Sequence, residues 1–136
     1  ANMLMRYKET GEINVADIEP GFEKSMNFSI ENYSIDTLGK YKIKLEVVTP
    51  LIDKEDENFV YELTGTANNN PSNNLLVNIS EKSVPVTTTV LGHAIITPKT
   101  LHDYKLTIKL KENGKDQNYL SGKIFIAKIV VEKDYE

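Results

Sequence analysis

Apolar and polar residues alternate along most of this chain, and this period of two constrains the fold more than any other feature. A first example follows the turn dipeptide Pro20-Gly21, where Met26, Phe28 and Ile30 alternate with polar neighbours. Successive side chains of a strand point to opposite faces, so the pattern predicts a strand with one buried and one solvated face. The most regular repeats are residues 41–47 and 104–111, in which lysines take most of the polar positions.

Similar runs predict strands over much of the rest of the chain: 12–18, 26–33, 59–64, 75–80, 84–91, 94–97 and 124–131. Turn residues separate them at intervals typical of an all-β fold, so we expect a two-sheet antiparallel β-sandwich, either Ig-like or jelly-roll. Residues 124–131 are apolar on both faces, which indicates a strand that is covered on both sides or central in its sheet. The Asn-rich residues 67–74 are expected to form an exposed loop.

Composition narrows the class of protein. The 136 residues suit one domain, 1–136, and 40% apolar residues can supply a core. A formal net charge of -4 argues against nucleic-acid binding. The absence of cysteine excludes a disulfide framework, thiol catalysis and thiolate zinc sites. No apolar run reaches the roughly 18 residues that span a bilayer.

No catalytic constellation stands out. There is no HExxH, GxSxG, P-loop or GxGxxG motif, so we predict no enzyme activity and no cofactor. His93 and His102 lie beside turn residues and are expected at the surface. A zinc or copper site would need both to converge with a carboxylate such as Asp103.

An acidic cluster is formed by Asp53, Glu55, Asp56 and Glu57. Several carboxylates on one loop make calcium binding admissible, but the glycine and spacing of an EF-hand are missing, so a solvated loop is the better interpretation.

Tyrosines could provide a glycan-binding face. Tyr41, Tyr61 and Tyr104 fall at inward positions and are expected in the core, whereas Tyr33 and Tyr119 lie near turns and are expected to be exposed. Tryptophan is absent, which lowers the case for a carbohydrate-binding or adhesin module.

The N-terminal segment carries Met3, Leu4, Met5 and Tyr7, an apolar stretch ahead of the main domain. This stretch is either the first strand of its own sheet or a donor strand, within residues 1–10, that completes the sheet of a neighbouring copy. Head-to-tail exchange that does not close would produce a filament.

One pattern combines a Pro-Gly turn, a strand and an Asn-x-Ser triplet, and an alternating strand follows at Tyr41. Its residues are Ile18, Pro20, Gly21, Phe28, Ile30, Asn32 and Ser34. The pattern resembles the opening of the TasA/camelysin family. Members of that family are secreted β-sandwich fibre proteins of Gram-positive bacteria, related in fold to archaeal bundling pilins. Residues 104–110 and 122–131 are similar to the closing hairpin of such domains.

The resemblance implies a structural subunit that is extracellular or on the cell surface and assembles with copies of itself. A bacteriophage capsid-decoration or tail-associated Ig-like protein is the alternative, because it would have the same composition.

Overall fold

The computed structural model describes residues 5–8, 12–69 and 72–134, which form strands, turns and loops and no helix. The strands are β1 (Met5–Lys8), β2 (Ile13–Ile18), β3 (Glu23–Asn32), β4 (Gly39–Thr49), β5 (Phe59–Ala67), β6 (Ile79–Ser83), β7 (Thr89–Ile96), β8 (Thr100–Leu110) and β9 (Lys123–Lys133). The described part of the chain accordingly contains no helix that could cross a membrane.

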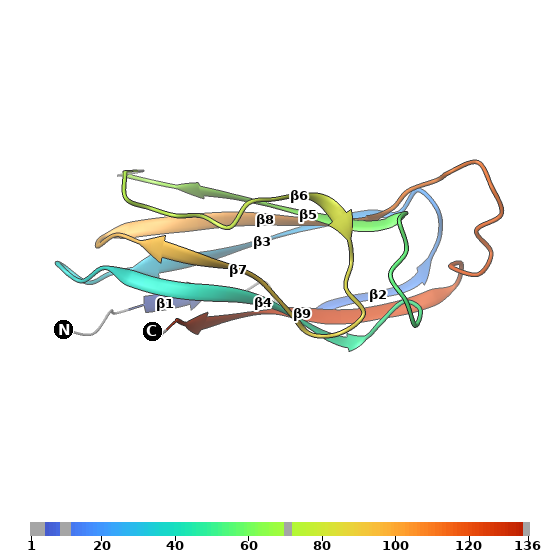
Figure 1. The fold of residues 1–136 in the computed structure, drawn as a ribbon, viewed down its shortest axis with the longest axis horizontal. Helices are drawn as coiled ribbons and strands as arrows, with labels where there is room; N and C mark the ends of the chain where they lie inside the picture. Colours follow the sequence, from blue (N-terminus) through green and yellow to red (C-terminus); the bar gives the residue numbers. More distant parts are fainter. Residues whose placement is uncertain (1–4, 9–11, 70–71, 135–136) are drawn as a thin grey trace.

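The strands form two sheets that face each other (Figure 1). Sheet A has the order β1-β3-β8-β5-β6, and sheet B has the order β2-β9-β4-β7. Every pair of neighbours is antiparallel. The predicted all-β, two-sheet antiparallel β-sandwich is therefore confirmed.

The core lies between the inner faces of the two sheets, and the alternation in the sequence fills it. In β4, the inward Tyr41, Ile43 and Leu45 are completely buried. In β8, every second residue from Tyr104 to Leu110 is at most 2% exposed. Phe125 of β9 packs edge to face against Phe59 of β5, with ring centres 5.2 Å apart, so aromatic rings join the sheets at one end.

The connections mostly alternate between the two sheets. Apart from β5–β6, each connection carries the chain from one sheet to the other. The two strands latest in the sequence, β8 and β9, are both central: β8 lies between β3 and β5, and β9 lies between β2 and β4. The expected closing hairpin is therefore wrong, because β8 and β9 belong to different sheets. The central position of β9 agrees with its two apolar faces.

Three predicted strands differ from the structure: 75–80, 84–91 and 94–97. In the predicted strand 75–80, Leu75 forms one isolated bridge to Ile95, and only Ile79 and Ser80 belong to a strand, as the start of β6. Val77 is the one buried residue of that stretch. Residues 84–88, predicted as the start of a strand, lie outside any strand, and the predicted break at Gly92 is wrong. Instead, β7 runs through Gly92, and a register shift opposite residues 43 and 44 accommodates one extra residue.

Candidate functional site

The N-terminal strand β1 pairs with β3 of its own chain. Met5 lies opposite Asn32 and Lys8 opposite Ser29, so β1 is the edge strand of sheet A. Met3 and Leu4 lie outside the described residues, as do the side chains of Met5 and Tyr7.

The described side-chain contacts of β1 come from Arg6. Its guanidinium lies 4.8 Å from the centre of the Tyr33 ring and 3.7 Å from the Glu31 carboxylate. Arg6 and Glu31 are both well exposed, so these contacts add little stability, and β1 is a short strand on an open edge.

His102 is in the core, so its predicted surface position is wrong. Its side chain is fully buried, and the phenol oxygen of Tyr41 lies 2.7 Å from His102 Nδ1. On the other side, His102 Nε2 lies 2.8 Å from Asn74 Oδ1. The imidazole, on β8, thus connects β4 of sheet B with the loop that follows β5.

The hydrogen bonds around His102 select one tautomer of its ring. The Thr97 amide donates to Asn74 Oδ1 at 3.1 Å, so this oxygen is an acceptor and His102 Nε2–H donates to it as well. The neutral ring then carries its proton on Nε2, and Nδ1 accepts from the Tyr41 hydroxyl.

The donor and acceptor roles of the second tyrosine, Tyr104, follow from the same hydrogen bonds. Since the Tyr41 hydroxyl donates to His102, it accepts from the Tyr104 hydroxyl, which lies 2.6 Å away. The Tyr104 oxygen accepts in turn from the Val77 amide at 3.1 Å. The network therefore runs from a backbone amide through two phenols and an imidazole to the Asn74 side chain.

Two threonines extend the network at its other end. Asn74 Nδ2 donates to Thr97 Oγ1 at 3.0 Å, and Thr97 Oγ1 lies 2.6 Å from Thr100 Oγ1. Thr100 Oγ1 donates in turn to the Pro98 carbonyl. Residues 68, 69, 72 and 73 of the predicted exposed loop 67–74 are exposed, but Asn74 is half-buried and joins the network at one end of the sandwich. A buried group without a partner costs about 1–3 kcal/mol, so this continuous chain stabilises the fold.

Burial also sets the ionisation of these groups. Loss of water lowers the pKa of His102 to about 4. Burial and the neighbouring Tyr104 raise the pKa of Tyr41 well above its ordinary value, and burial raises the pKa of Tyr104. All three side chains are at most 2% exposed. The network therefore joins the two sheets and the 74–78 segment through buried, neutral groups.

The second histidine, His93, lies at the surface, as predicted. His93 is on β7, opposite Lys42, and its Nδ1 lies 2.6 Å from the Asp134 carboxylate at the surface. Because His93 faces outward and His102 inward, the two do not converge with Asp103. No cluster of three metal-ligating side chains occurs in the described part of the chain.

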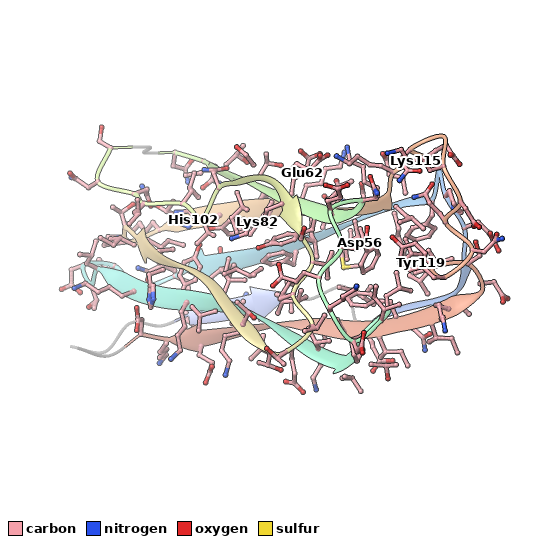
Figure 2. The ribbon with its side chains drawn as sticks, turned by 45° about the vertical axis from the view of Figure 1, so that its right-hand side comes forward. Asp56, Glu62, Lys82, His102, Lys115 and Tyr119 are labelled. Carbon is pink, nitrogen blue, oxygen red and sulfur yellow. The ribbon has the colours of Figure 1, made fainter. Side chains whose placement is uncertain are left out.

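Asp56, in the middle of the acidic loop, makes hydrogen bonds that stabilise the loop. Asp56 Oδ1 accepts from the Asn58 amide at 2.8 Å, and Asp56 Oδ2 accepts from the Tyr119 hydroxyl at 2.6 Å (Figure 2). Asp53, Glu55 and Glu57 are exposed around it. Asp56 thus links the β4–β5 and β8–β9 connections, in agreement with the loop interpretation.

Tyr33 and Tyr119 are exposed, as predicted, at 43% and 51%. They lie at opposite ends of the sandwich, since Tyr33 follows the end of β3 that pairs with Thr100, and Tyr119 lies beyond Leu110 at the other end of β8. The length of β8 separates them by about 33 Å. They do not form one stacking face for a sugar chain.

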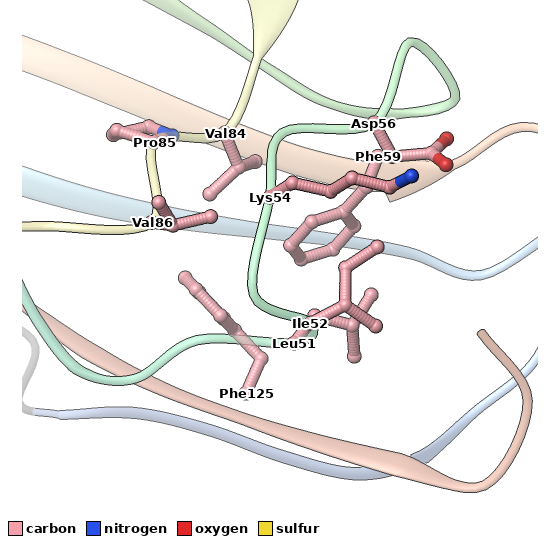
Figure 3. A pocket seen from close by; sticks show the side chains of 9 residues that line it. All are labelled: Leu51, Ile52, Lys54, Asp56, Phe59, Val84, Pro85, Val86 and Phe125. Carbon is pink, nitrogen blue, oxygen red and sulfur yellow. The ribbon is translucent and has the colours of Figure 1, made fainter. Parts of the chain in front are cut away.

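A shallow hollow lies between the β4–β5 and β6–β7 connections (Figure 3). Its enclosed space, about 10 Å³, is roughly that of one water molecule. It is too small to enclose an organic substrate. The residues around it are mostly apolar: Leu51, Ile52, Phe59, Val84, Pro85, Val86 and Phe125, with Lys54 and Asp56 at the edge.

Sequence reasoning placed Tyr41 and Tyr104 in the core but missed the other members of the network: His102, Asn74, Thr97 and Thr100. One signal for His102 was present: it continues the same alternation as Tyr104, Leu106 and Ile108 by one step. Thr100 continues it by a second step. Asn74 carried no such signal, because its role depends on a loop that folds back over the core.

Comparison of the chain with protein-family models, with curated proteins and with solved structures finds no match.

Proposed function

We propose that this protein is a structural subunit of an extracellular filament or surface assembly, in which copies are joined by exchange of the N-terminal strand. The observation that carries the proposal is the position of β1. It is a four-residue strand at the edge of sheet A, and within the described residues its one partner is β3.

Such a strand is suited to exchange between copies. If β1 of one copy pairs with β3 of the next, the intramolecular hydrogen bonds are replaced by identical intermolecular ones, and little free energy changes. The apolar Met3, Leu4, Met5 and Tyr7 would be the residues exchanged. The extracellular setting rests on the resemblance to secreted fibre proteins.

The register of β1 and β3 allows a test with introduced cysteines, and the chain has no cysteine of its own that could interfere. Arg6 lies directly opposite Glu31. Directly opposed residues of an antiparallel pair are close enough for a disulfide. We expect the R6C/E31C variant to give a ladder of covalent multimers on a non-reducing gel after assembly at high concentration.

The matched control is N27C/K105C, a pair on β3 and β8 within the domain. It is expected to crosslink only within one chain. If R6C/E31C also crosslinks only within one chain, and electron microscopy shows single particles at all concentrations, strand exchange is refuted.

A further inference from the structure

The connection between β3 and β4, residues 33–38, presents apolar side chains to solvent at one end of the sandwich. Ile35 is 80% exposed, Leu38 49% and Tyr33 43%. Single exposed apolar residues are common, but three within six residues form a patch that favours contact with another apolar group. We call residues 33–38 the apolar tip.

Hydrogen bonds hold the apolar tip in one shape. The buried Asn32 donates through Nδ2 to the carbonyls of Thr37 and Ile96, at 2.8 and 3.0 Å. Its Oδ1 accepts from both the amide and the hydroxyl of Ser34, and that hydroxyl also lies 2.8 Å from the Thr37 carbonyl. Because the loop is already ordered, little conformational entropy is lost when Ile35 is covered.

The strand β1 leads directly to the apolar tip. In the register of β1 and β3, Met5 lies opposite Asn32, the last residue of β3 and the one before the tip. Figure 1 shows the start of β1 and the β3–β4 connection at the same end of the molecule. Residues 1–4 lie outside the part of the chain that the structure describes. If the antiparallel pairing continues by one residue, Leu4 lies opposite Tyr33, with Met3 next to it.

One described contact already joins β1 to the tip. The Arg6 guanidinium lies 4.8 Å from the centre of the Tyr33 ring. Residues two apart in a strand lie on the same face, so Leu4 shares the face of Arg6 if the strand continues. Directly opposed residues of an antiparallel pair have Cβ atoms about 5 Å apart, which is close enough for large side chains to touch. A segment tethered one residue away also has an effective concentration on the order of millimolar, which favours it over a free partner.

We propose that Met3 and Leu4 cover the apolar tip. Leu4 packs on the Tyr33 ring, and Met3, whose unbranched side chain adapts to irregular surfaces, reaches towards Ile35. Both residues are apolar, so the contact removes apolar surface on both sides from water. Asp36, the one charged residue of the tip, is exposed at its surface, so covering Tyr33 and Ile35 does not require a charge to be buried.

The same contact supplies a receiving surface for strand exchange, and this part of the proposal rests on the proposed function. A donor strand that pairs with β3 of the next copy, with Met5 opposite Asn32, ends beside the apolar tip of that copy. The main-chain hydrogen bonds of a four-residue strand set no unique register, whereas apolar side chains that fit a patch do. A slip by two residues would move Leu4 away from Tyr33, so the tip selects one register.

The first test measures whether the tip is covered. I35C introduces the only thiol of the chain at a largely exposed position, so the fold is retained. We expect this thiol to react with a maleimide about tenfold faster when M3S and L4S are added, as for the loss of one apolar contact. The control is V90C, at a position 45% exposed on the outer face of sheet B, whose rate should not respond to M3S and L4S. Equal rates for I35C with and without M3S and L4S would overturn the proposal.

The second test separates the tip contact from strand exchange. L4C/Y33C should form a disulfide on oxidation, because the two positions are directly opposed when the pairing continues by one residue. The control L4C/V90C joins different sheets and should keep its thiols free. A ladder of multimers from L4C/Y33C supports both proposals, and a crosslink within single chains at every concentration supports the tip contact and refutes exchange. If L4C/Y33C stays reduced while R6C/E31C crosslinks, the tip contact is wrong, and if neither pair crosslinks, both proposals are wrong.

Discussion

Removal of one hydroxyl, in Tyr41→Phe, tests whether the buried network stabilises the fold. The Tyr41 oxygen lies 2.6 Å from the Tyr104 oxygen and 2.7 Å from His102 Nδ1. The variant keeps the ring but leaves one donor and one acceptor without a partner. At about 1–3 kcal/mol for each such group, we expect a loss of about 2–6 kcal/mol in the free energy of unfolding.

That loss is large beside the total of about 5–15 kcal/mol for a typical domain. Urea unfolding should be followed by circular dichroism, since the chain has no tryptophan. The midpoint should fall while the slope with urea stays constant, because the surface exposed on unfolding does not change.

Tyr119→Phe is the matched control. Its hydroxyl also donates at 2.6 Å, to Asp56, but the side chain is exposed and water replaces the lost partner. We expect almost no change in the urea midpoint. If Tyr41→Phe is no less stable than Tyr119→Phe, the burial argument is refuted.

Other side chains give separate tests of burial, packing and charge. The contribution of His102 to the free energy of unfolding should be complete above about pH 6.5 and fall by up to about 3 kcal/mol as the pH drops towards 4. The reason is that the unfolded chain binds a proton in this range, whereas the buried His102, with its pKa of about 4, does not. In urea unfolding repeated across this pH range, His102→Gln should remove this part of the pH dependence. Gly65→Ala should destabilise the fold by about 1–3 kcal/mol in the same assay, because a Cβ there would lie 2.5 Å from the Tyr104 ring. Glu81→Gln should leave the thermal midpoint nearly unchanged, because its ion pairs with Lys109 and Lys111 are at the surface.

The parts of the fold that sequence predicted are those governed by local periodicity. Burial of Tyr41, Ile43 and Leu45 follows from the period of two alone, as does burial of Tyr61 and Tyr104. The alternation says which face of a strand is apolar, and the inner faces of two sheets suffice to cover it.

Partners in space could not be predicted in the same way. Strand order depends on long-range pairing. The two apolar faces of β9 indicated a central or covered strand, but nothing in the residues of β8 or β9 indicates which strands lie beside them. The interpretation of His102 failed because the adjacent Asp103 suggested a turn, whereas β8 begins at Thr100 and carries both residues on alternate faces. Asn74 was assigned to an exposed loop because the residues around it are polar. In the structure its side-chain oxygen accepts hydrogen bonds from the Thr97 amide and from His102 Nε2.

The central placement of β8 and β9 governs when this protein can fold. Residues 1–99 contain β1 to β7 but neither of the strands that join them. A nascent chain of that length could form only the β1–β3, β5–β6 and β4–β7 fragments, and β2 would have no partner. We therefore expect the sandwich to form only once β8 and β9 have been made, because these two strands draw the earlier ones together.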